Sequence, residues 1–200
     1  KMHFGELGNL AYLRPNYAKV VADLCKEQGG MPFLTDCNTL YPGSRKNALE
    51  HLTCAQLNGF WPMTTGCQVI IADGLRGTDE VEVPVPNGEY CKTAKIGRAI
   101  MDADIFISLR HFKGHESTGF GGAIKNIGMG CGSRAGKMEQ HASGHPAVQE
   151  DLCRGCHRCA KECGSDAISY NEKNKAVIDQ DKCKGCGRCI GACNFDAIYA

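Results

Sequence analysis

The sequence predicts an α/β domain with a mainly parallel sheet over residues 1–145, followed by a small α+β module over residues 146–200. Two observations lead to this fold class. In the first 145 residues, short apolar runs alternate with stretches of helical periodicity, which is typical of strands and helices that build a parallel sheet. The remaining residues hold eight cysteines in a duplicated pattern and few large apolar side chains, so we expect a separate unit.

Three helices are expected before the glycine-rich loop, and a further one is expected to open at Gly121–Asn126, where its free N–H groups would attract an anion. The first begins at Pro15, because proline suits the first helical position, and ends at Gly29–Gly30. Ser44 favours the N-cap of the second helix, which ends near Gly59. The third covers Thr93–Met101. One face of the first helix is expected to carry the apolar residues Tyr17, Val20, Val21 and Leu24.

Short apolar runs between these helices predict strands. The alternation over Val81–Val85 indicates an edge strand or one arm of a hairpin. Ligands usually bind in loops at the carboxyl ends of parallel strands, so the loop after residue 109 is a candidate site. The expected short or buried strands are Met2–Phe4, Pro32–Thr35, Val69–Ala72 and Ile105–Leu109.

One cysteine pattern, Cys-x2-Cys-x2-Cys-x3-Cys, occurs twice in the module, and the second copy follows the first by 30 residues. Three cysteines at this spacing can each bind a different iron of one cubane, and the fourth iron needs a thiolate from elsewhere. In such bacterial-type runs the fourth cysteine binds the other cluster. We therefore assign Cys153, Cys156, Cys159 and Cys193 to one [4Fe–4S] cluster, and Cys183, Cys186, Cys189 and Cys163 to another.

Over about residues 146–200 the chain resembles the two-cluster ferredoxin module of bacteria. Zinc is the alternative metal, but it prefers two separated Cys-x2-Cys pairs, and four cysteines in one run overfill that pattern. Structural disulfides fit less well, because the triplets are placed to converge on a metal. The proline that usually follows the fourth cysteine is replaced by Gly164 and Asn194. This departure affects the local turn and the reduction potential.

Composition narrows the class of protein. A hydrophobic fraction of 42% and a charged fraction of 22% are those of a soluble globular protein. The net charge of +1 gives no general case for nucleic-acid binding, and no apolar run approaches the ~20 residues of a membrane helix. Six of the 14 cysteines lie outside the module without a motif, which indicates a reducing cytoplasm. Because the first residue is Lys1, a longer natural chain is an open expectation.

The glycine-rich loop after residue 109 is the second informative stretch. It holds eight glycines between Gly114 and Gly136, and glycine lets a ligand approach the backbone closely. Five basic residues over 110–139 stand against two acidic ones, which favours a small anionic ligand. A glycine-rich turn with solvated lysines is the alternative. The residues assigned to an anion or cofactor are Lys113, Gly119, Gly121, Gly122, Lys125 and Arg134.

Four histidines flank the loop. Near neutral pH an imidazole can act as an acid, a base or a metal ligand. A histidine that only makes hydrogen bonds is the alternative for each of them. The four residues are His111, His115, His141 and His145.

The loop also carries a family resemblance. Residues 111–130 read His-x-Lys-x-His-x3-Gly-Phe-Gly-Gly-Ala-x-Lys-Asn-x-Gly-Met-Gly, and the cysteine module follows. This combination resembles the uncharacterised iron–sulfur centre proteins, which carry a domain of unknown function. The resemblance covers nearly the whole chain. It implies the iron–sulfur clusters and leaves the reaction open.

A shorter resemblance is to the nickel-pincer lactate racemases, which carry a histidine, a glycine-rich run with a lysine, and a later histidine. His115, Lys125 and His141 fall in that order, with Gly119-Phe120-Gly121-Gly122 before the lysine. The resemblance implies that Lys125 anchors a nickel cofactor, His141 binds nickel and His115 moves a substrate proton. These three are therefore the candidate catalytic residues. Gly121 replaces the serine of that family, and no arginine precedes Lys125.

Three functions follow from these patterns. The first is an iron–sulfur oxidoreductase whose clusters exchange electrons with a redox partner protein and with an anionic substrate or cofactor at the loop. The second is a pure electron carrier that docks a partner and has no substrate of its own. The third is a nickel-dependent racemase or isomerase with accessory clusters.

Overall fold

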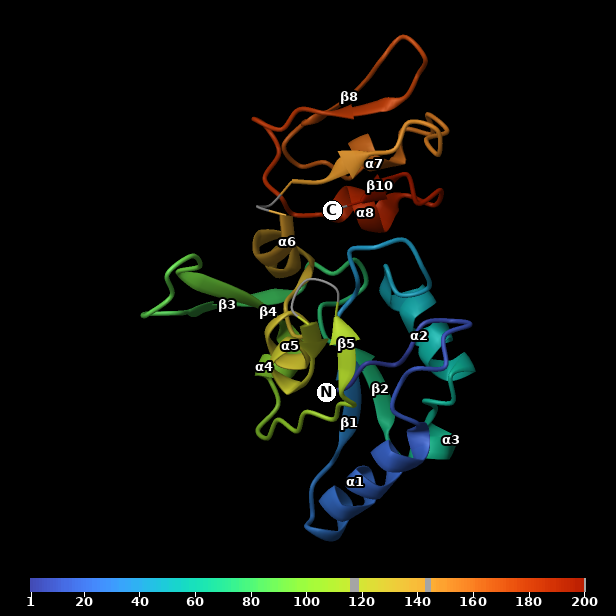
Figure 1. The fold of residues 1–200 in the computed structure, drawn as a ribbon, viewed down its shortest axis with the longest axis vertical. Helices are drawn as coiled ribbons and strands as arrows, with labels where there is room; N and C mark the ends of the chain where they lie inside the picture. Colours follow the sequence, from blue (N-terminus) through green and yellow to red (C-terminus); the bar gives the residue numbers. More distant parts are fainter. Residues whose placement is uncertain (116–118, 143–144, 200) are drawn as a thin grey trace.

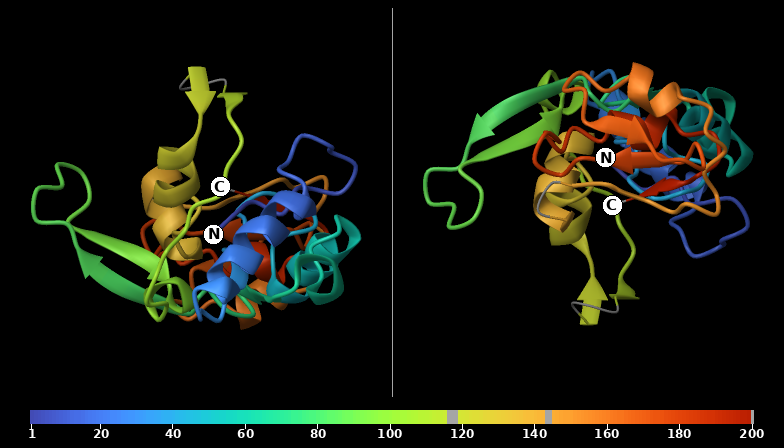
Figure 2. Two further views of the ribbon diagram at one scale, coloured as in Figure 1. Left: turned by 90° about the horizontal axis from the view of Figure 1, so that it is seen from below. Right: turned by 90° about the horizontal axis from the view of Figure 1, so that it is seen from above.

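The computed structural model describes residues 1–115, 119–142 and 145–199. The molecule is elongated, with the cysteine-rich module at one end and α1 (Pro15–Glu27) at the other (Figure 1). Two hairpins extend from the body in different directions (Figure 2). Within the described residues, no helix combines the length and the apolar character needed to cross a membrane.

A parallel strand pair lies at the centre of the first domain. β1 (Phe33–Asp36) pairs with β2 (Gln68–Ile71), so the predicted strands at 32–35 and 69–72 are confirmed within a residue at each end. The helix α1 begins at Pro15, as predicted. The next helices are α2 (Ala48–Leu57) and α3 (Pro62–Thr65). The prediction that Ser44 caps the second helix was wrong, because the N-cap is Asn47, whose side chain accepts from the Glu50 amide.

The strand pair and the helices α1 to α3 enclose one apolar core. The rings of Phe4 and Phe60 lie 5.2 Å apart at its centre, and both side chains are fully buried. From α1, however, the buried residues are Ala18 and Ala22. The predicted apolar face of α1 is mostly exposed, since Tyr17, Val20 and Leu24 all have more than half of their surface in solvent. The helical spacing therefore identified a row of apolar residues on α1, but it did not identify the face of α1 that packs against the core.

The predicted strands Met2–Phe4 and Ile105–Leu109 are extended chain without a ladder. The Met2 amide donates to the Thr35 carbonyl of β1 over 3.0 Å, and the Leu109 amide donates to the Lys1 carbonyl over 2.9 Å. These segments therefore continue the β1–β2 layer by isolated bonds only. The prediction of regular strands was wrong here, although the buried position of Met2 and Phe4 agrees with the apolar pattern.

The segment after β2 is a hairpin followed by one short helical turn. β3 (Glu80–Pro84) pairs antiparallel with β4 (Thr93–Gly97), and α4 (Arg98–Met101) follows directly. The hairpin arm predicted near Val81–Val85 is confirmed. The helix predicted over Thr93–Met101 was wrong in its first half, because the partner strand β3 takes that stretch into a sheet.

The glycine-rich loop forms a second hairpin and two helices. β5 (Lys113–His115) pairs antiparallel with β6 (Gly119–Gly121), and the exposed rings of Phe112 and Phe120 stack 5.4 Å apart beside it. α5 (Ala123–Gly128) follows immediately. α6 (Arg134–Ala142) then leads to the module.

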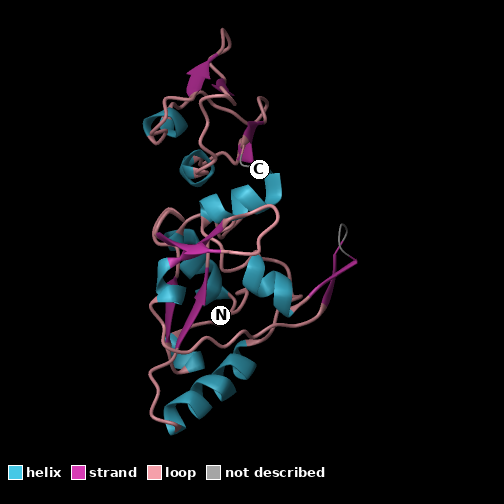
Figure 3. Ribbon diagram, turned by 90° about the vertical axis from the view of Figure 1, so that its left-hand side faces the viewer, coloured by secondary structure: helices cyan, strands magenta, loops and turns pink. Residues whose placement is uncertain are grey.

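The module consists of two small antiparallel sheets and two short helices (Figures 1 and 3). The elements are β7 (Ala147–Val148), α7 (Arg158–Lys161), β8 (Ile168–Tyr170), β9 (Ala176–Ile178), α8 (Arg188–Ala192) and β10 (Ile198–Tyr199). β7 pairs with β10, and β8 pairs with β9. The duplication extends to the backbone, since the left-handed residues Asp166 and Asp196 stand 30 positions apart with φ of 49° and 53°.

The structure is thus a mixed α/β domain followed by a small module, but a mainly parallel sheet is not present in the described residues. Their strands form five two-stranded sheets, and only β1–β2 is parallel. Short apolar runs predict that a segment is extended. They do not specify its partner, and the local hairpins β3–β4 and β5–β6 compete with a single large sheet.

Candidate metal centre

The first predicted ligand set gathers around one small cavity in the module. Three cysteines of the first run line it together with Cys193 of the second run and Tyr170. Cys153, Cys159 and Cys193 are buried, whereas Cys156 is exposed. The cavity thus joins a triplet to the fourth cysteine of the other repeat.

The second set lies around α8. Burial, together with the neighbouring thiols of Cys186 and Cys183, raises the pKa of Cys189 to about 12. α7 packs against α8, and a Cβ on Gly164 would lie 3.9 Å from a guanidinium nitrogen of Arg188. Gly164 follows Cys163 and Arg188 precedes Cys189, so the end of the first run lies near the second triplet.

Backbone amides donate to the sulfurs in the same way in both repeats. Ala167 N donates to the Cys163 sulfur over 3.3 Å, and Ala197 N donates to the Cys193 sulfur over 3.4 Å. These are the two fourth cysteines, and each donor stands four residues further on. Ala176 N also donates to the Cys153 sulfur over 3.4 Å. Amide donors stabilise the negative charge of a metal-bound thiolate and tune the reduction potential of an iron–sulfur cluster.

The donor set of the module fits an iron–sulfur centre. Its cysteines recur in two runs, and in each run a backbone N–H group donates to the sulfur of the fourth cysteine. In the described part of the chain, no three His, Cys, Asp or Glu side chains are grouped in a way that would hold one metal ion.

Two basic side chains lie where the first domain meets the module. Arg134, at the start of α6, is fully buried and donates to the carbonyls of Thr39 and Arg76 over 3.1 Å each, and to the carbonyl of Lys46. Lys46 Nζ donates to the Cys193 carbonyl over 3.0 Å and pairs with Asp196 at 2.6 Å. Both contacts of Lys46 fall next to the fourth cysteine of the second run, so this junction holds a predicted cluster ligand in place.

Arg134 also lies against the second triplet. A Cβ on Gly187 or on Gly191 would meet its side chain at 2.7 Å and 3.0 Å, respectively. The Cys189 and Cys186 thiols interact with its charge, although burial dominates and lowers the pKa of the guanidinium. Arg134 was predicted to bind an anion or cofactor. Its guanidinium instead donates to backbone carbonyls of the first domain, beside the cluster loop.

A separate basic group forms at the β5–β6 hairpin. Lys125 Nζ contacts the Nε2 atom of His115, so the structure brings two of the three candidate catalytic residues together. A Cβ on Gly121 would lie 3.2 Å from Arg110 and 3.9 Å from Lys113. Burial and the charges of Arg110 and Lys125 lower the pKa of Lys113. We call Arg110, Lys113, His115 and Lys125 the hairpin basic group.

Of the remaining predicted residues of the loop, some lie beside the hairpin basic group and others lie elsewhere. Gly121 ends β6 beside the hairpin basic group, and Gly122 follows it as the N-cap of α5. Gly119 begins β6 with a φ of 75°, a backbone conformation that favours glycine. His141 belongs to α6, but its side chain lies outside the described residues. The proposed trio of His115, Lys125 and His141 is therefore described only for its first two members.

Several contributors to the metal centre carried no sequence motif. Tyr170 Oη lies 3.4 Å from the Cys159 sulfur, and its ring stacks on His157 with 3.8 Å between centroids. Lys46 and Arg134 meet the module from positions far along the chain. Tyr170 follows the duplicated stretch, whose match ends at Ile168, so the repeat does not single it out. The two basic residues are brought there by tertiary packing, which no local pattern records.

Comparison with known proteins places these features in context. A family model described as a domain of unknown function, DUF362, matches residues 1–179. A model of a 4Fe-4S binding domain matches residues 176–199, which contain the second cysteine run. The chain is 27% identical over 127 residues to Thylakoid-associated protein sll1697 of Synechocystis sp. (strain ATCC 27184 / PCC 6803 / Kazusa). That match covers 62% of this chain and 34% of the relative, so the chain spans about a third of the relative's length.

Proposed function

Since the chain belongs to the DUF362 family and carries a 4Fe-4S binding domain, we propose that it holds two [4Fe–4S] clusters and passes single electrons between a partner protein and a site in the first domain. Each cluster, when bound, takes up and releases one electron. The observation that carries the proposal is the cavity that joins Cys193 to the first triplet, together with the equivalent amide donors to Cys163 and Cys193. The division at residues 145 and 146 stays a prediction, and the pairing of β7 with β10 supports it.

The exchange of fourth ligands can be tested one cluster at a time. Cys193→Ser removes the fourth ligand from the first triplet in the proposed arrangement. Anaerobic protein would be treated with an alkylating reagent, and the modified cysteines would be identified by mass spectrometry. We expect the thiols of Cys153, Cys156 and Cys159 to become reactive while those of the second triplet stay protected.

Cys163→Ser is the reciprocal variant and should expose Cys183, Cys186 and Cys189 instead. Cys25→Ser, on α1 and outside the module, is the matched control and should leave both triplets protected. If Cys193→Ser exposes the second triplet and spares the first, each run binds its own cluster and the crossed assignment is wrong.

We further infer that the hairpin basic group binds a small anion, which makes it the site that communicates with the clusters. Three cationic side chains and His115 gather around Gly121, which is buried beneath them. Among the described residues, one guanidinium nitrogen of Arg110 is buried without a hydrogen-bond partner. A buried donor of this kind gains free energy when an anion accepts from it.

Inorganic phosphate is a suitable first probe for this site. Its dissociation constant would be measured by isothermal titration calorimetry with the iron-loaded chain. We expect Lys125→Ala and Lys113→Ala each to weaken phosphate binding by about tenfold, the loss of one charge-assisted hydrogen bond. Lys19→Ala, an exposed lysine of α1 paired with Asp23, should leave binding unchanged. Absence of phosphate binding in the parent chain contradicts the anion site and leaves the cluster proposal standing.

Two alternatives make different predictions. If the protein is only an electron carrier, Lys125→Ala keeps its full rate of electron transfer to the partner and loses no other activity. The contact between His115 and Lys125 brings together two residues of the nickel-pincer interpretation. That interpretation requires nickel near one atom per chain in protein from a cell that makes the cofactor. An activity as oxidoreductase and a cytoplasmic location stay predictions.

A further inference from the structure

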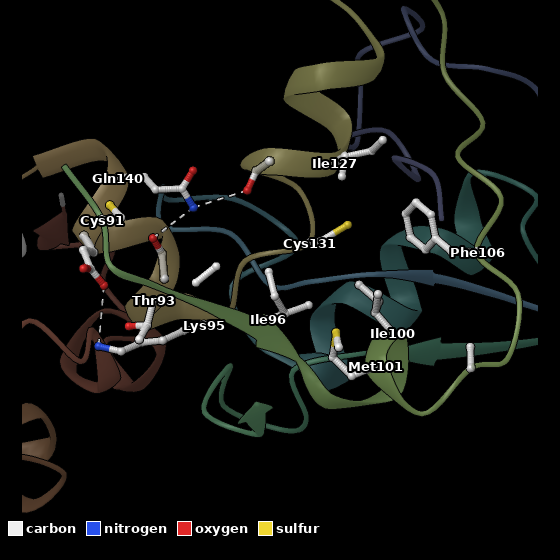
Figure 4. Close-up of a pocket in the computed structure, with 15 residues that line it drawn as sticks. Cys91, Thr93, Lys95, Ile96, Ile100, Met101, Phe106, Ile127, Cys131 and Gln140 are labelled. Atoms are coloured by element: carbon white, nitrogen blue, oxygen red, sulfur yellow. Dashed lines mark hydrogen bonds and ion pairs between the residues drawn. The ribbon is translucent and has the colours of Figure 1, made fainter. Parts of the chain in front are cut away.

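A second cavity lies in the first domain, away from the hairpin basic group, between β4, α4, α5 and α6 (Figure 4). Its volume is about 500 Å³, which is within the range of small-molecule sites. Ile96, Ile100, Phe106 and Ile127 point into it from four different segments. Ile127 and Phe106 each keep about two fifths of their surface exposed there, so the apolar wall is open to solvent.

The polar groups at the rim carry no net charge. Lys95 and Glu139 face each other with 3.7 Å between Nζ and a carboxylate oxygen. Gln140 donates to the Gly128 and Gly136 carbonyls over 3.2 Å each, which ties α5 to α6 at the edge of the cavity. A rim of this kind suits an uncharged, mostly apolar ligand, in contrast to the anion proposed for the hairpin basic group. Lys95 and Thr93 line the cavity and carry hydrogen-bond donors.

The helix α6 separates this cavity from the metal centre. Gly136, Glu139 and Gln140 line the cavity. Arg134 and Met138 stand on the other side of the helix, where Arg134 meets the second cysteine loop and Met138 joins the apolar core that contains the buried cysteines. Residues four apart share one helix face, so the two sets face opposite ways. One helix, about 10–12 Å across, lies between a ligand in the cavity and the cysteine loops.

From these observations we propose that the cavity binds an uncharged redox-active ring compound of the quinone class. Apolar walls suit the ring, the neutral rim with donors suits its carbonyl oxygens, and the position next to the module suits a molecule that exchanges electrons. The proposal that the cavity binds an uncharged ring does not depend on the anion site proposed for the hairpin basic group. The proposal that this ring is redox-active rests on the clusters proposed above.

The probe is duroquinone, whose fully methylated ring has no position at which a free thiol can add. Binding to the anaerobically purified, iron-loaded chain would be measured by ligand-observed NMR and equilibrium dialysis. Met101 lies at the mouth with 44% of its surface exposed, so Met101→Trp fills the cavity without disturbing the core. We expect this variant to weaken duroquinone binding by about tenfold or more.

Met63→Trp is the matched control, because Met63 is 88% exposed on α3 and lies outside the cavity. It should change duroquinone affinity by less than about twofold, which corresponds to 0.4 kcal/mol or less. Benzoate serves as the charged ring and should not compete. The proposal is overturned if duroquinone does not bind, if Met101→Trp leaves its affinity unchanged, or if benzoate binds in its place. These results are independent of iron content and phosphate binding, so they separate this site from the proposed function.

Discussion

Replacing Arg134 by methionine removes a guanidinium that links three segments of the first domain beside the second cysteine loop, and it keeps most of the aliphatic length. Two of the carbonyls that lose their donor, those of Thr39 and Lys46, are buried, and the carbonyl of Arg76 is partly buried. An orphaned buried acceptor costs about 1–3 kcal/mol, so the two buried carbonyls set a range of about 2–6 kcal/mol. The variant also removes the cost of burying a cation, which favours the lower part of that range. We expect the free energy of unfolding to fall by about 2–4 kcal/mol.

Urea unfolding of anaerobic, iron-loaded protein would measure this loss, with circular dichroism and cluster absorbance followed together. Arg98→Met is the matched control, since Arg98 pairs with Asp79 at 2.8 Å and both side chains are about half exposed. An exposed ion pair of this kind contributes about 0–1 kcal/mol. Arg134→Lys should recover only part of the stability, because one ammonium cannot reach all three carbonyls. A loss below about 1 kcal/mol in Arg134→Met would refute the view that the buried hydrogen bonds of this side chain stabilise the fold.

Three further changes probe other parts of the molecule. Gly187→Ala should destabilise the module by at least about 1 kcal/mol, because φ is 65° and the new Cβ would lie 2.7 Å from Arg134. The loss would be measured as a lower melting temperature, and an unchanged melting temperature would contradict it. Cys156→Ser should make residues 146–200 more sensitive to protease than the first domain, and equal sensitivity would count against a cluster-dependent module. Burial lowers the pKa of His51 to about 3, so stability should fall as the pH drops below 6.5, and His51→Phe should flatten that dependence in urea titrations.

The sign of the His51 effect follows from proton binding. The unfolded imidazole takes up a proton below its ordinary pKa of 6.5, whereas the buried ring stays neutral until about pH 3. The unfolded state therefore binds more protons between these values, and stability rises with pH across them. Asp73 acts in the opposite direction, since burial raises its pKa from 3.8 to about 6. His3 acts in the same direction as His51, because burial lowers its pKa to about 4. Asp73 and His3 therefore oppose each other between about pH 4 and about pH 6, and His51→Phe should leave only a weak pH dependence there.

The module was the part most open to prediction from sequence. Cluster ligation requires three cysteines at fixed short spacings, so the chemistry is written into consecutive residues. The repeat also fixes the backbone, because Gly155 and Gly185 have φ values of 62° and 63° in the two loops. The proline at position 15 predicted the first helical residue for a similarly local reason, its fixed backbone torsion.

Features that depend on distant partners were not predictable in this way. The stretch Thr93–Gly97 has a helix-compatible pattern, but pairing with β3 makes it a strand. α1 packs through two alanines and exposes the larger apolar residues of its stripe. Arg134 was assigned to an anion because it ends a basic, glycine-rich loop, yet residues 39, 46 and 76 supply its acceptors. In each case the deciding contact comes from another part of the chain.

The most direct test for two clusters is an elemental analysis of anaerobically purified protein. It would measure iron and acid-labile sulfide together with nickel and zinc. Two four-iron clusters predict about eight iron and about eight sulfide per chain, with all eight module cysteines protected from alkylation. About four iron per chain after anaerobic reconstitution, or zinc without sulfide, would contradict the two-cluster proposal.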